Sequence, residues 1–436
     1  MTRKHIRLCA LSAFAAMTAA CSLDEINPNA PTQGVIFNSR EGMVSLAVGL
    51  QARYGAGLSA FAYPGGLISD EMGTPSGALQ SYKDAEIGAL AATYAAVEVP
   101  WASHYQTIKT ANDLIGNVAN VPLGPETQSG IRSLAYLFKA ASLGELLQLY
   151  QKIVIDPQSP SPVFVDRSPA LTYVVALLDT ALAQANAVPA RAEFDASIIA
   201  RGLNLKNTIY AMQARYQRMA NNWTAALAAA NAVDTSVVSI MPFSDQAVNP
   251  MFDISVTQVR PRDTLRLIAA AGDARVPFHI SGATVAGTIR PLRSFTQFAT
   301  RTAPVALYWP GEIMLIKAEA YANTGQIPLA AAQVNYVRAR CGGVANQPKA
   351  CLAALPASSL ATQAQVIAEI YAQRQVELFA TGLRWEDVRR QGLVSATSAY
   401  AKRCWLLYPN SELSTQPNVP ISPAGDPPVT FSKCGI

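Results

Sequence analysis

Apolar residues recur every three to four positions along much of the chain, the spacing of one buried face on an amphipathic helix. The clearest run covers residues 131–151, where Leu134, Leu137, Phe138 and Ala141 alternate with polar positions. The same spacing predicts further helices over residues 101–118, 171–188, 205–220, 224–233, 311–323, 329–340 and 362–379. Residues 234–308 instead carry scattered Pro, Gly and β-branched residues, so we expect long loops and short strands there.

Two predicted helix pairs repeat the residue spacing of a tetratricopeptide repeat. In the second pair, the small, aromatic, Gly, Ala and bulky positions are, in that order, Ala318, Tyr321, Gly325, Ala330 and Val334. The first pair has Ala214, Trp223, Ala226 and Ala230, with Asn221 where the Gly is expected. We therefore predict a mainly α fold in which such pairs form a right-handed superhelical scaffold, with long loop insertions and a few short strands.

The first twenty residues have the pattern of an export signal. A basic start with Arg3, Lys4 and Arg7 precedes the apolar run Leu8–Ala20, which is too short to span a bilayer. Small residues then lead directly to Cys21, the arrangement of a lipoprotein cleavage site, although Thr18 stands where Leu is usual. Cys21 would carry the lipid anchor, palmitate included. An ordinary secretory signal cleaved near the same alanines is the alternative.

The organisation that follows is one domain behind a short tether. Residues 1–20 are the signal and residues 21–33, which are polar and turn-rich, are the flexible tether. We expect residues 34–436 to form a single domain with three parts, 34–233, an irregular insertion at 234–307, and 308–436.

Charge adds little to this picture. The chain of 436 residues has a formal net charge of +5, but loss of Arg3, Lys4 and Arg7 leaves 31 basic and 29 acidic residues. Such a balance gives no electrostatic footprint for nucleic acid. Beyond the signal no long uncharged apolar run is present, so membrane attachment has to come from the lipid.

Four cysteines remain after export and acylation. The local pairing, Cys341 with Cys351 and Cys404 with Cys434, closes the shortest loops. A zinc site is the alternative, but the spacings lack the two to four residues between ligands that zinc ribbons use.

Catalytic motifs are nearly absent. Beyond the signal the only histidines are His104 and His279, and neither lies in a zinc-binding or hydrolase motif. We predict no catalytic residue, no metal and no cofactor. An all-helical glycoside hydrolase stays open as an alternative because it needs only two carboxylates, and Asp70, Glu71, Asp84 and Glu86 lie in one region.

Two segments carry a resemblance to the SusD/RagB family. Residues 308–342 resemble its aromatic helix entry followed by an AEA helix and an N-x-V-R-x-R helix, and residues 369–390 resemble its second charged segment. The residues that match, and that we expect to be structural, are Ala318, Tyr321, Gly325, Asn335, Arg338, Arg374, Glu377, Gly382, Arg384 and Asp387. Gln373 and Thr381 depart from the family pattern, in which Glu is usual.

The resemblance implies a non-catalytic lipoprotein on the outer membrane, facing outward, that binds a nutrient and delivers it to a TonB-dependent, SusC-like transporter. We expect a glycan as the nutrient, with peptides as an alternative, and a scaffold for complex assembly as the alternative function. Sugars stack on aromatic rings, so aromatic residues in loops are the candidates. Those in the Gly-, Pro- and Ala-rich segment before the first clear helix are Phe61, Tyr63, Tyr82, Tyr94 and Trp101. Trp101 follows a predicted helix start and either packs in the core or forms a platform.

Overall fold

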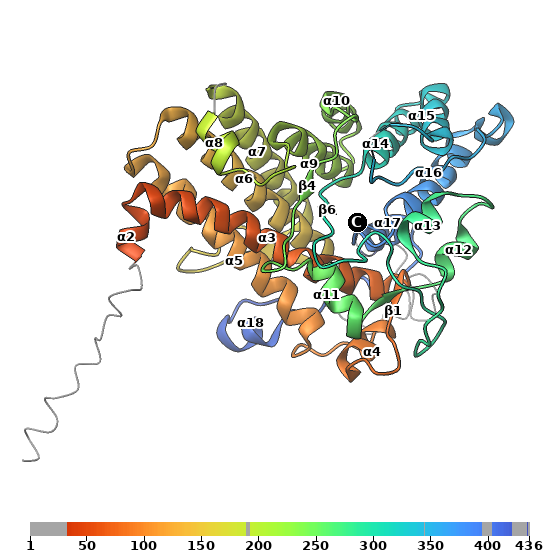
Figure 1. The fold of residues 1–436 in the computed structure, drawn as a ribbon, viewed down its shortest axis with the longest axis horizontal. Coiled ribbons are helices and arrows are strands. Elements are labelled where there is room, and N and C mark those ends of the chain that lie inside the picture. Colours follow the sequence, from red (N-terminus) through yellow and green to blue (C-terminus); the bar gives the residue numbers. More distant parts are fainter. Residues whose placement is uncertain (1–32, 189–191, 344, 395–402, 421–433, 435–436) are drawn as a thin grey trace, which may run out of the picture.

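The structure is a computed structural model that describes residues 33–188, 192–343, 345–394, 403–420 and 434. Figure 1 shows a mainly helical molecule with a few short strands, which confirms the predicted fold class. The predicted signal, Cys21 and most of the tether lie outside the described residues. Within the described part, no helix has both the length and the apolar character that crossing a membrane requires.

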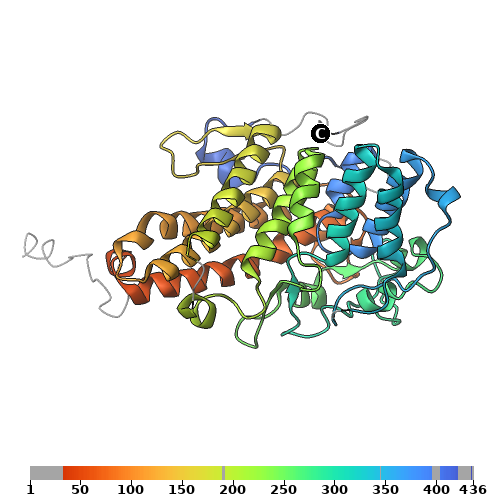
Figure 2. The same ribbon diagram turned by 90° about the horizontal axis from the view of Figure 1, so that it is seen from above.

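A central helix that the apolar spacing did not predict comes first. After the short α2 (Gln33–Phe37), helix α3 (Arg40–Ile68) begins where Ser39 Oγ accepts a hydrogen bond from the backbone N–H of Gly42 at 3.1 Å. In Figure 2 α3 runs beneath the row of later helices. Neighbours cover it on several sides, so its apolar residues do not form one stripe. This explains why sequence spacing missed it.

Apart from the short α8, which was not predicted, the next helices follow the predicted order. They are α5 (Ala95–Asn117), α6 (Pro125–Leu149), α7 (Arg167–Ala187), α8 (Ala192–Ser197), α9 (Leu205–Met219) and α10 (Trp223–Ala232), with η1 (Val118–Asn120) between α5 and α6. Helix α6 packs against α5 and α7, and α9 packs against α10. Helix α5 starts six residues before the predicted start, so Pro100 lies inside it and the placing of Trp101 at a helix start was wrong.

The C-terminal pairs complete the scaffold. They comprise α14 (Pro310–Asn323), α15 (Ile327–Ala339), η2 (Ala357–Leu360), α16 (Gln363–Glu377), α17 (Arg384–Arg390) and α18 (Asn410–Thr415). Ala318 and Ala330 are fully buried where α14 and α15 meet, and Tyr321 packs against the same apolar cluster. Helix α14 also packs against α10 and α16, which continues the row seen in Figure 2.

Both repeat turns use the left-handed backbone region. Gly325 has φ +78° between α14 and α15, and Asn221 has φ +60° between α9 and α10. Asn is one of the few residues other than Gly that adopts this conformation readily. The first pair therefore keeps the turn geometry of the repeat without its glycine.

The middle region is irregular, as expected. It contains β4 (Ile240–Met241), α11 (Pro250–Thr257), β5 (Arg260–Pro261), α12 (Thr264–Ile268), α13 (Arg275–His279) and β6 (Val305–Ala306). Earlier in the chain lie β1 (Met72–Gly73), α4 (Gln80–Glu86), β2 (Lys152–Val154) and β3 (Phe164–Asp166). The strands form antiparallel pairs β1 with β5, β2 with β3 and β4 with β6, which place Met72 opposite Pro261 and Ile240 opposite Ala306. The β1–β5 pair ties this region to the end of α3.

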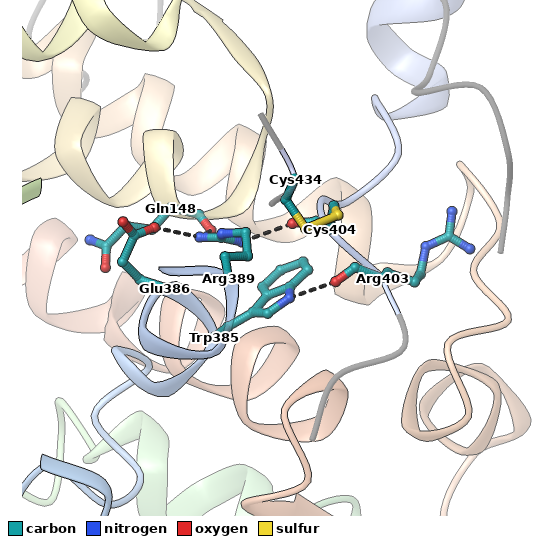
Figure 3. The surroundings of a disulfide bond; sticks show 7 residues. All are labelled: Gln148, Trp385, Glu386, Arg389, Arg403, Cys404 and Cys434. Atoms are coloured by element: carbon teal, nitrogen blue, oxygen red, sulfur yellow. Dashed lines mark hydrogen bonds and ion pairs between the residues drawn. A yellow bond between two sulfur atoms is a disulfide. The ribbon is translucent and has the colours of Figure 1, made fainter. Parts of the chain in front are cut away.

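The C-terminal segment is held by a buried arginine beside the second disulfide. Cys404 is bonded to Cys434, and Arg389 donates to the backbone oxygens of Cys404 at 2.9 Å and Gln148 at 2.7 Å. Figure 3 shows these contacts together with the Trp385 Nε1–H that donates to the Arg403 carbonyl. Helix α17 therefore connects this segment to the end of α6.

Candidate functional site

Trp101 belongs to the core. Its side chain is buried, and its ring lies 4.7 Å from that of Tyr105, 4.9 Å from that of Tyr150 and 6.0 Å from that of Phe164, measured between centroids. Tyr408 closes the cluster at 5.9 Å. Of the two roles open to Trp101, core packing is the one found, because neighbouring rings occupy the faces that a ligand needs.

Phe61 and Tyr63 are also buried. They lie on α3, in what sequence reasoning took for a loop, and Phe61 packs so closely on Gly382 that a Cβ there would lie 2.7 Å from the ring. Gly382 has φ +86°, which explains the glycine in the second charged segment. The Tyr63 hydroxyl donates to the Met251 carbonyl at 2.5 Å, which ties α3 to α11. Neither ring forms an exposed stacking surface.

Tyr82 lines a small apolar hollow, which we call the Tyr82 hollow. Helices α3, α4, α5 and α11 meet there, and the hollow encloses about 70 Å³. Its walls include Tyr63, Pro64, Tyr82, Val99, Pro100 and Ile254. The Tyr82 ring is half-buried and Val99 is half-exposed, so this apolar surface is open to solvent. Of the five predicted aromatics, the hollow brings together Tyr63 and Tyr82.

Tyr94 stands at the start of α5 and is bound to α4. Its hydroxyl donates to Asp84 Oδ2 at 2.7 Å, and Gln80 donates to Asp84 Oδ1 at 2.7 Å. These hydrogen bonds lower the pKa of Asp84, and the one from Tyr94 has the larger effect. They fix the short helix that presents Tyr82, so Tyr94 acts here as a positioning residue.

The carboxylates considered for hydrolysis bind protein groups. Arg262 reaches Asp70 at 2.8 Å and also binds Glu86, whose carboxylate accepts from the Thr74 backbone N–H at 3.1 Å. Glu71 is buried, and burial raises its pKa to about 8. Asp70, Glu86 and Arg262 thus join the β1 region to the middle region.

No three His, Cys, Asp or Glu side chains gather as metal ligands in the part of the chain that the structure describes. The four cysteines considered for zinc instead form the local disulfides, Cys341 with Cys351 and Cys404 with Cys434.

Residues 293–414 match the model of the SusD family. This match identifies residues 293–414 as a SusD family region, as the resemblance implied. The match spans both segments that carry the resemblance. No curated protein matches the chain.

Solved structures of SusD relatives extend the likeness in fold to most of the chain. A SusD superfamily protein from Bacteroides fragilis is 17% identical with a TM-score of 0.65, covering 88% of this chain and 99% of its own. NanU from B. fragilis is 13% identical with a TM-score of 0.68, covering 91% of this chain and 99% of its own. A SusD-like carbohydrate-binding protein from Bacteroides vulgatus is 13% identical with a TM-score of 0.61, covering 80% of this chain and 83% of its own. At such identities these likenesses establish the fold alone.

The SusD motif residues form a buried ionic network, which we call the Arg218 network. Arg218 binds Glu319 and lies 2.9 Å from Asp387, and Arg374 binds Asp387 at 2.8 Å. Arg390 lies at the rim of the network, and its Nη2 is 3.3 Å from Glu319 Oε1. Burial alone would raise the pKa of Asp387, but Arg374 and Arg218 outweigh it and hold that pKa below its usual value. The network joins α9, α14, α16 and α17.

A second cluster surrounds Glu377. Its carboxylate lies 3.2 Å from Arg275 Nη1 and 3.0 Å from Arg340 Nη2. Gln373, which stands where Glu is usual in the SusD family, accepts from Arg275 at 2.7 Å and donates to Glu369 at 2.7 Å. The departure from the family pattern thus replaces an ionic contact by hydrogen bonds.

The remaining motif residues also have structural contacts. Asn335 exchanges two hydrogen bonds with the backbone of Leu355, at 3.0 and 2.8 Å, as expected for a residue that cross-links elements. Arg338 binds Glu369 at 3.1 Å between α15 and α16, and Arg384 is buried in α17.

Sequence reasoning missed a buried polar group between α3, α5 and α6, which we call the Glu145 group. The Tyr54 hydroxyl donates to Glu145 Oε1 at 2.6 Å, and His104 Nδ1 lies 3.4 Å from Glu145 Oε2. Burial raises the pKa of Glu145 to about 7 and lowers that of His104 to about 3. Glu145 also lines a cavity of about 50 Å³, with Arg215 and Glu312. Glu145 and His104 lie 41 positions apart, so no local motif could have indicated this group.

Proposed function

We propose that this SusD family protein is a non-catalytic receptor that binds a nutrient, most simply a glycan, and delivers it to a TonB-dependent, SusC-like transporter of the outer membrane. The observation that supports this proposal best is the Tyr82 hollow, an open apolar surface lined by an aromatic ring. It occurs in a chain that matches the SusD family model. A carbohydrate-binding protein of similar fold supports the choice of ligand.

The hollow suits part of a sugar better than a whole one. At about 70 Å³ it is far smaller than the roughly 300–1,000 Å³ of typical small-molecule sites. A sugar ring would therefore lie across the mouth, with its C–H face on the Tyr82 ring and an apolar edge in the hollow. A contact of this size gives an affinity in the micromolar to millimolar range, which permits release to a transporter.

Hydrolysis has less support than binding. Asp70 and Glu86 share Arg262, and Asp84 is held by Tyr94 and Gln80. A glycoside hydrolase needs two carboxyl groups that face the scissile bond from opposite sides. These carboxylates are instead used to connect the elements around the hollow.

Location on the outer membrane rests on Cys21 and its preceding signal, which lie outside the described residues. We expect Cys21→Ala to release the protein from outer membranes, and protease added to whole cells to cleave the wild type. Retention of the variant in the membrane, or full protection from protease, would show that the location is wrong.

The binding test compares two tyrosines. In a glycan screen followed by calorimetry, Tyr82→Ala should weaken binding about tenfold, since an aromatic platform adds on the order of 1 kcal/mol beyond its buried area. Tyr173→Ala is the matched control, because Tyr173 is a half-buried ring on α7, away from α4 (Figure 1). Equal effects of the two substitutions would place the ligand elsewhere.

The transport test is purification from outer membranes through a tag on this protein. A large β-barrel protein should copurify, and Cys21→Ala should reduce its yield. Turnover of a glycan by the purified protein would overturn the non-catalytic proposal.

A further inference from the structure

A second hollow lies at the end of α15, beside the Glu377 cluster. It encloses about 460 Å³, and we call it the Tyr336 groove. Its walls include Thr235, Ser236, Tyr336, Arg340, Gly343 and Gln347. The volume falls within the usual range for sites that bind small molecules. No motif of the sequence pointed to this groove.

We propose that the Tyr336 groove is a second ligand site and that it binds one or two units of a neutral sugar. This inference goes beyond the proposed function, since it concerns separate residues and stands if the Tyr82 hollow binds nothing. Its parts are an exposed ring, hydroxyl and amide groups, a guanidinium fixed by hydrogen bonds, and a cross-linked wall.

The exposed ring is that of Tyr336, whose residue surface is 50% exposed although it is a large apolar side chain. It stands in the last turns of α15, so the helix fixes its position. Thr235 and Ser236 come from the loop after α10. The Ser236 hydroxyl donates to Asp234 Oδ1 at 2.6 Å, so it can accept a hydrogen bond from a ligand. An aromatic face beside hydroxyl and amide groups matches a pyranose, which has an apolar C–H face and a rim of hydroxyls.

Arg340 forms a fixed part of the groove wall. Its side chain is only 9% exposed, and Nη2 donates to the Pro348 carbonyl at 2.7 Å and to Glu377 Oε1 at 3.0 Å. These hydrogen bonds hold the guanidinium in one position, so Arg340 helps to shape the groove before a ligand arrives.

The charges favour a neutral ligand over an anion. Glu377 already balances Arg340, and the groove lies where α15 ends at Ala339. The C-terminal end of a helix carries partial negative charge, which disfavours phosphate or carboxylate. The amine of Lys349 donates to the Gly343 carbonyl at 3.3 Å and so is used within the loop.

The wall of the groove is held in place before any ligand arrives. The Cys341–Cys351 disulfide closes the loop, and the backbone N–H groups of Cys351 and Leu352 donate to the carbonyls of Arg340 at 3.2 Å and Arg338 at 2.8 Å. A pre-formed wall lowers the ordering cost of binding. Opening the disulfide should therefore weaken binding in this groove and leave the Tyr82 hollow unchanged.

The test uses fluorine NMR of the full chain labelled with 3-fluorotyrosine. Tyr336→Phe and Tyr82→Phe assign the two resonances, which makes the two sites separately visible. The probes are maltose, lactose and N,N′-diacetylchitobiose, with glucuronate and phosphate as anions. At least one neutral disaccharide should shift the Tyr336 resonance and saturate in the millimolar range, and the anions should not.

Calorimetry with that disaccharide then measures the contributions of the residues. Tyr336→Ala should weaken binding about tenfold, Ser236→Ala about threefold, and a Cys341→Ser/Cys351→Ser double variant should weaken it with an unchanged circular dichroism spectrum. Tyr173→Ala is the control and should have no effect. No shift of the Tyr336 resonance with any neutral probe, or a shift with the anions alone, would overturn the proposal.

Discussion

The Arg218 network and the Glu145 group both bury acids, yet the two regions treat them in opposite ways. Arg218 and Arg374 surround Asp387 and hold its pKa below the usual value, whereas burial dominates at Glu145 and raises its pKa to about 7. At Asp387 the attraction of Arg374 and Arg218 outweighs burial and favours the charged carboxylate. At Glu145 burial outweighs the hydrogen bond from Tyr54 and the attraction of Arg215, and it favours the protonated acid. Burial alone therefore does not indicate what a carboxyl group contributes to stability.

The two regions should fail at opposite ends of the pH scale. The lowered pKa of Asp387 gives stability that is present above the unfolded pKa and is lost as the pH falls toward the folded value. The raised pKa of Glu145 gives stability that is present below about pH 4.5 and is lost as the pH rises through about 7. Substitutions at each acid can separate these two contributions.

The largest expected loss of stability is at the centre of the Arg218 network. Asp387→Asn leaves Arg218 and Arg374 buried without their shared charge, and should lower the free energy of unfolding by about 3–5 kcal/mol. Urea denaturation at pH 7 measures this. Asp113→Asn is the control, because its pair with Lys109, at 2.8 Å, lies on the surface of α5 and should contribute about 0.5 kcal/mol or less. Similar losses for both variants would contradict the contrast.

Glu145→Gln should remove a pH dependence. The folded wild type holds the Glu145 proton up to about pH 7, so its stability should fall by about 3 kcal/mol between pH 4.5 and pH 8 through this group. The variant cannot ionise and should lack that fall. Denaturation curves at several pH values measure it, with the exposed Glu41→Gln as a control that keeps the wild-type profile. An unchanged profile in Glu145→Gln would mean that the carboxyl is already ionised at low pH.

Glu71 offers a second acid of the same kind with a different window. Burial raises its pKa to about 8, so its contribution should be lost over a range that ends one pH unit higher than that of Glu145. Glu71→Gln should therefore flatten the profile up to about pH 8, by about 5 kcal/mol. The same denaturation series tests this. A flattening confined below pH 7 would show that the pKa of Glu71 is not higher than that of Glu145.

The same contrast determines how much the sequence could predict. Arg374, Glu377 and Asp387 lie in one charged segment, so a pattern of neighbouring residues identified them as structural. Tyr54, His104 and Glu145 come from three helices, and only the fold brings them together. Local motifs can report a network whose members are close in sequence, and they cannot report one that depends on helix packing.

Helix prediction divided in a similar way. Helix α9, whose apolar residues gather on one face, was predicted to within one residue, whereas α3, whose apolar residues are spread around the helix, was missed. That omission also misled the search for a binding surface, since Phe61 and Tyr63 were assigned to a loop. Tyr82 was a useful candidate because it does lie outside the long helices, on the short α4.

Packing beside Glu145 gives a prediction of intermediate size. A Cβ added at Gly144 would lie 2.1 Å from Cζ of the buried Tyr216, so Gly144→Ala should cost about 1–3 kcal/mol. Gly116→Ala on α5 is the control, since nothing lies within 4 Å of its added Cβ and alanine favours a helix. Thermal unfolding measures both. A stabilised Gly144→Ala would show that α6 and α9 can separate at this point without loss.

The smallest expected effect is at the rim of the Arg218 network, where Asn221 Oδ1 accepts from Arg390 at 2.8 Å. Asn221→Gly removes this exposed hydrogen bond and keeps a residue suited to φ +60°, so stability should change by about 0.5 kcal/mol or less. Asn221→Ala removes the same bond and also strains the turn, which should cost about 1–2 kcal/mol. Urea denaturation of the two variants separates side-chain bonding from backbone conformation. Equal losses of unfolding free energy in both variants would mean that the hydrogen bond to Arg390, and not the backbone conformation, stabilises the turn. The rim of the network would then contribute to stability, as its buried centre does.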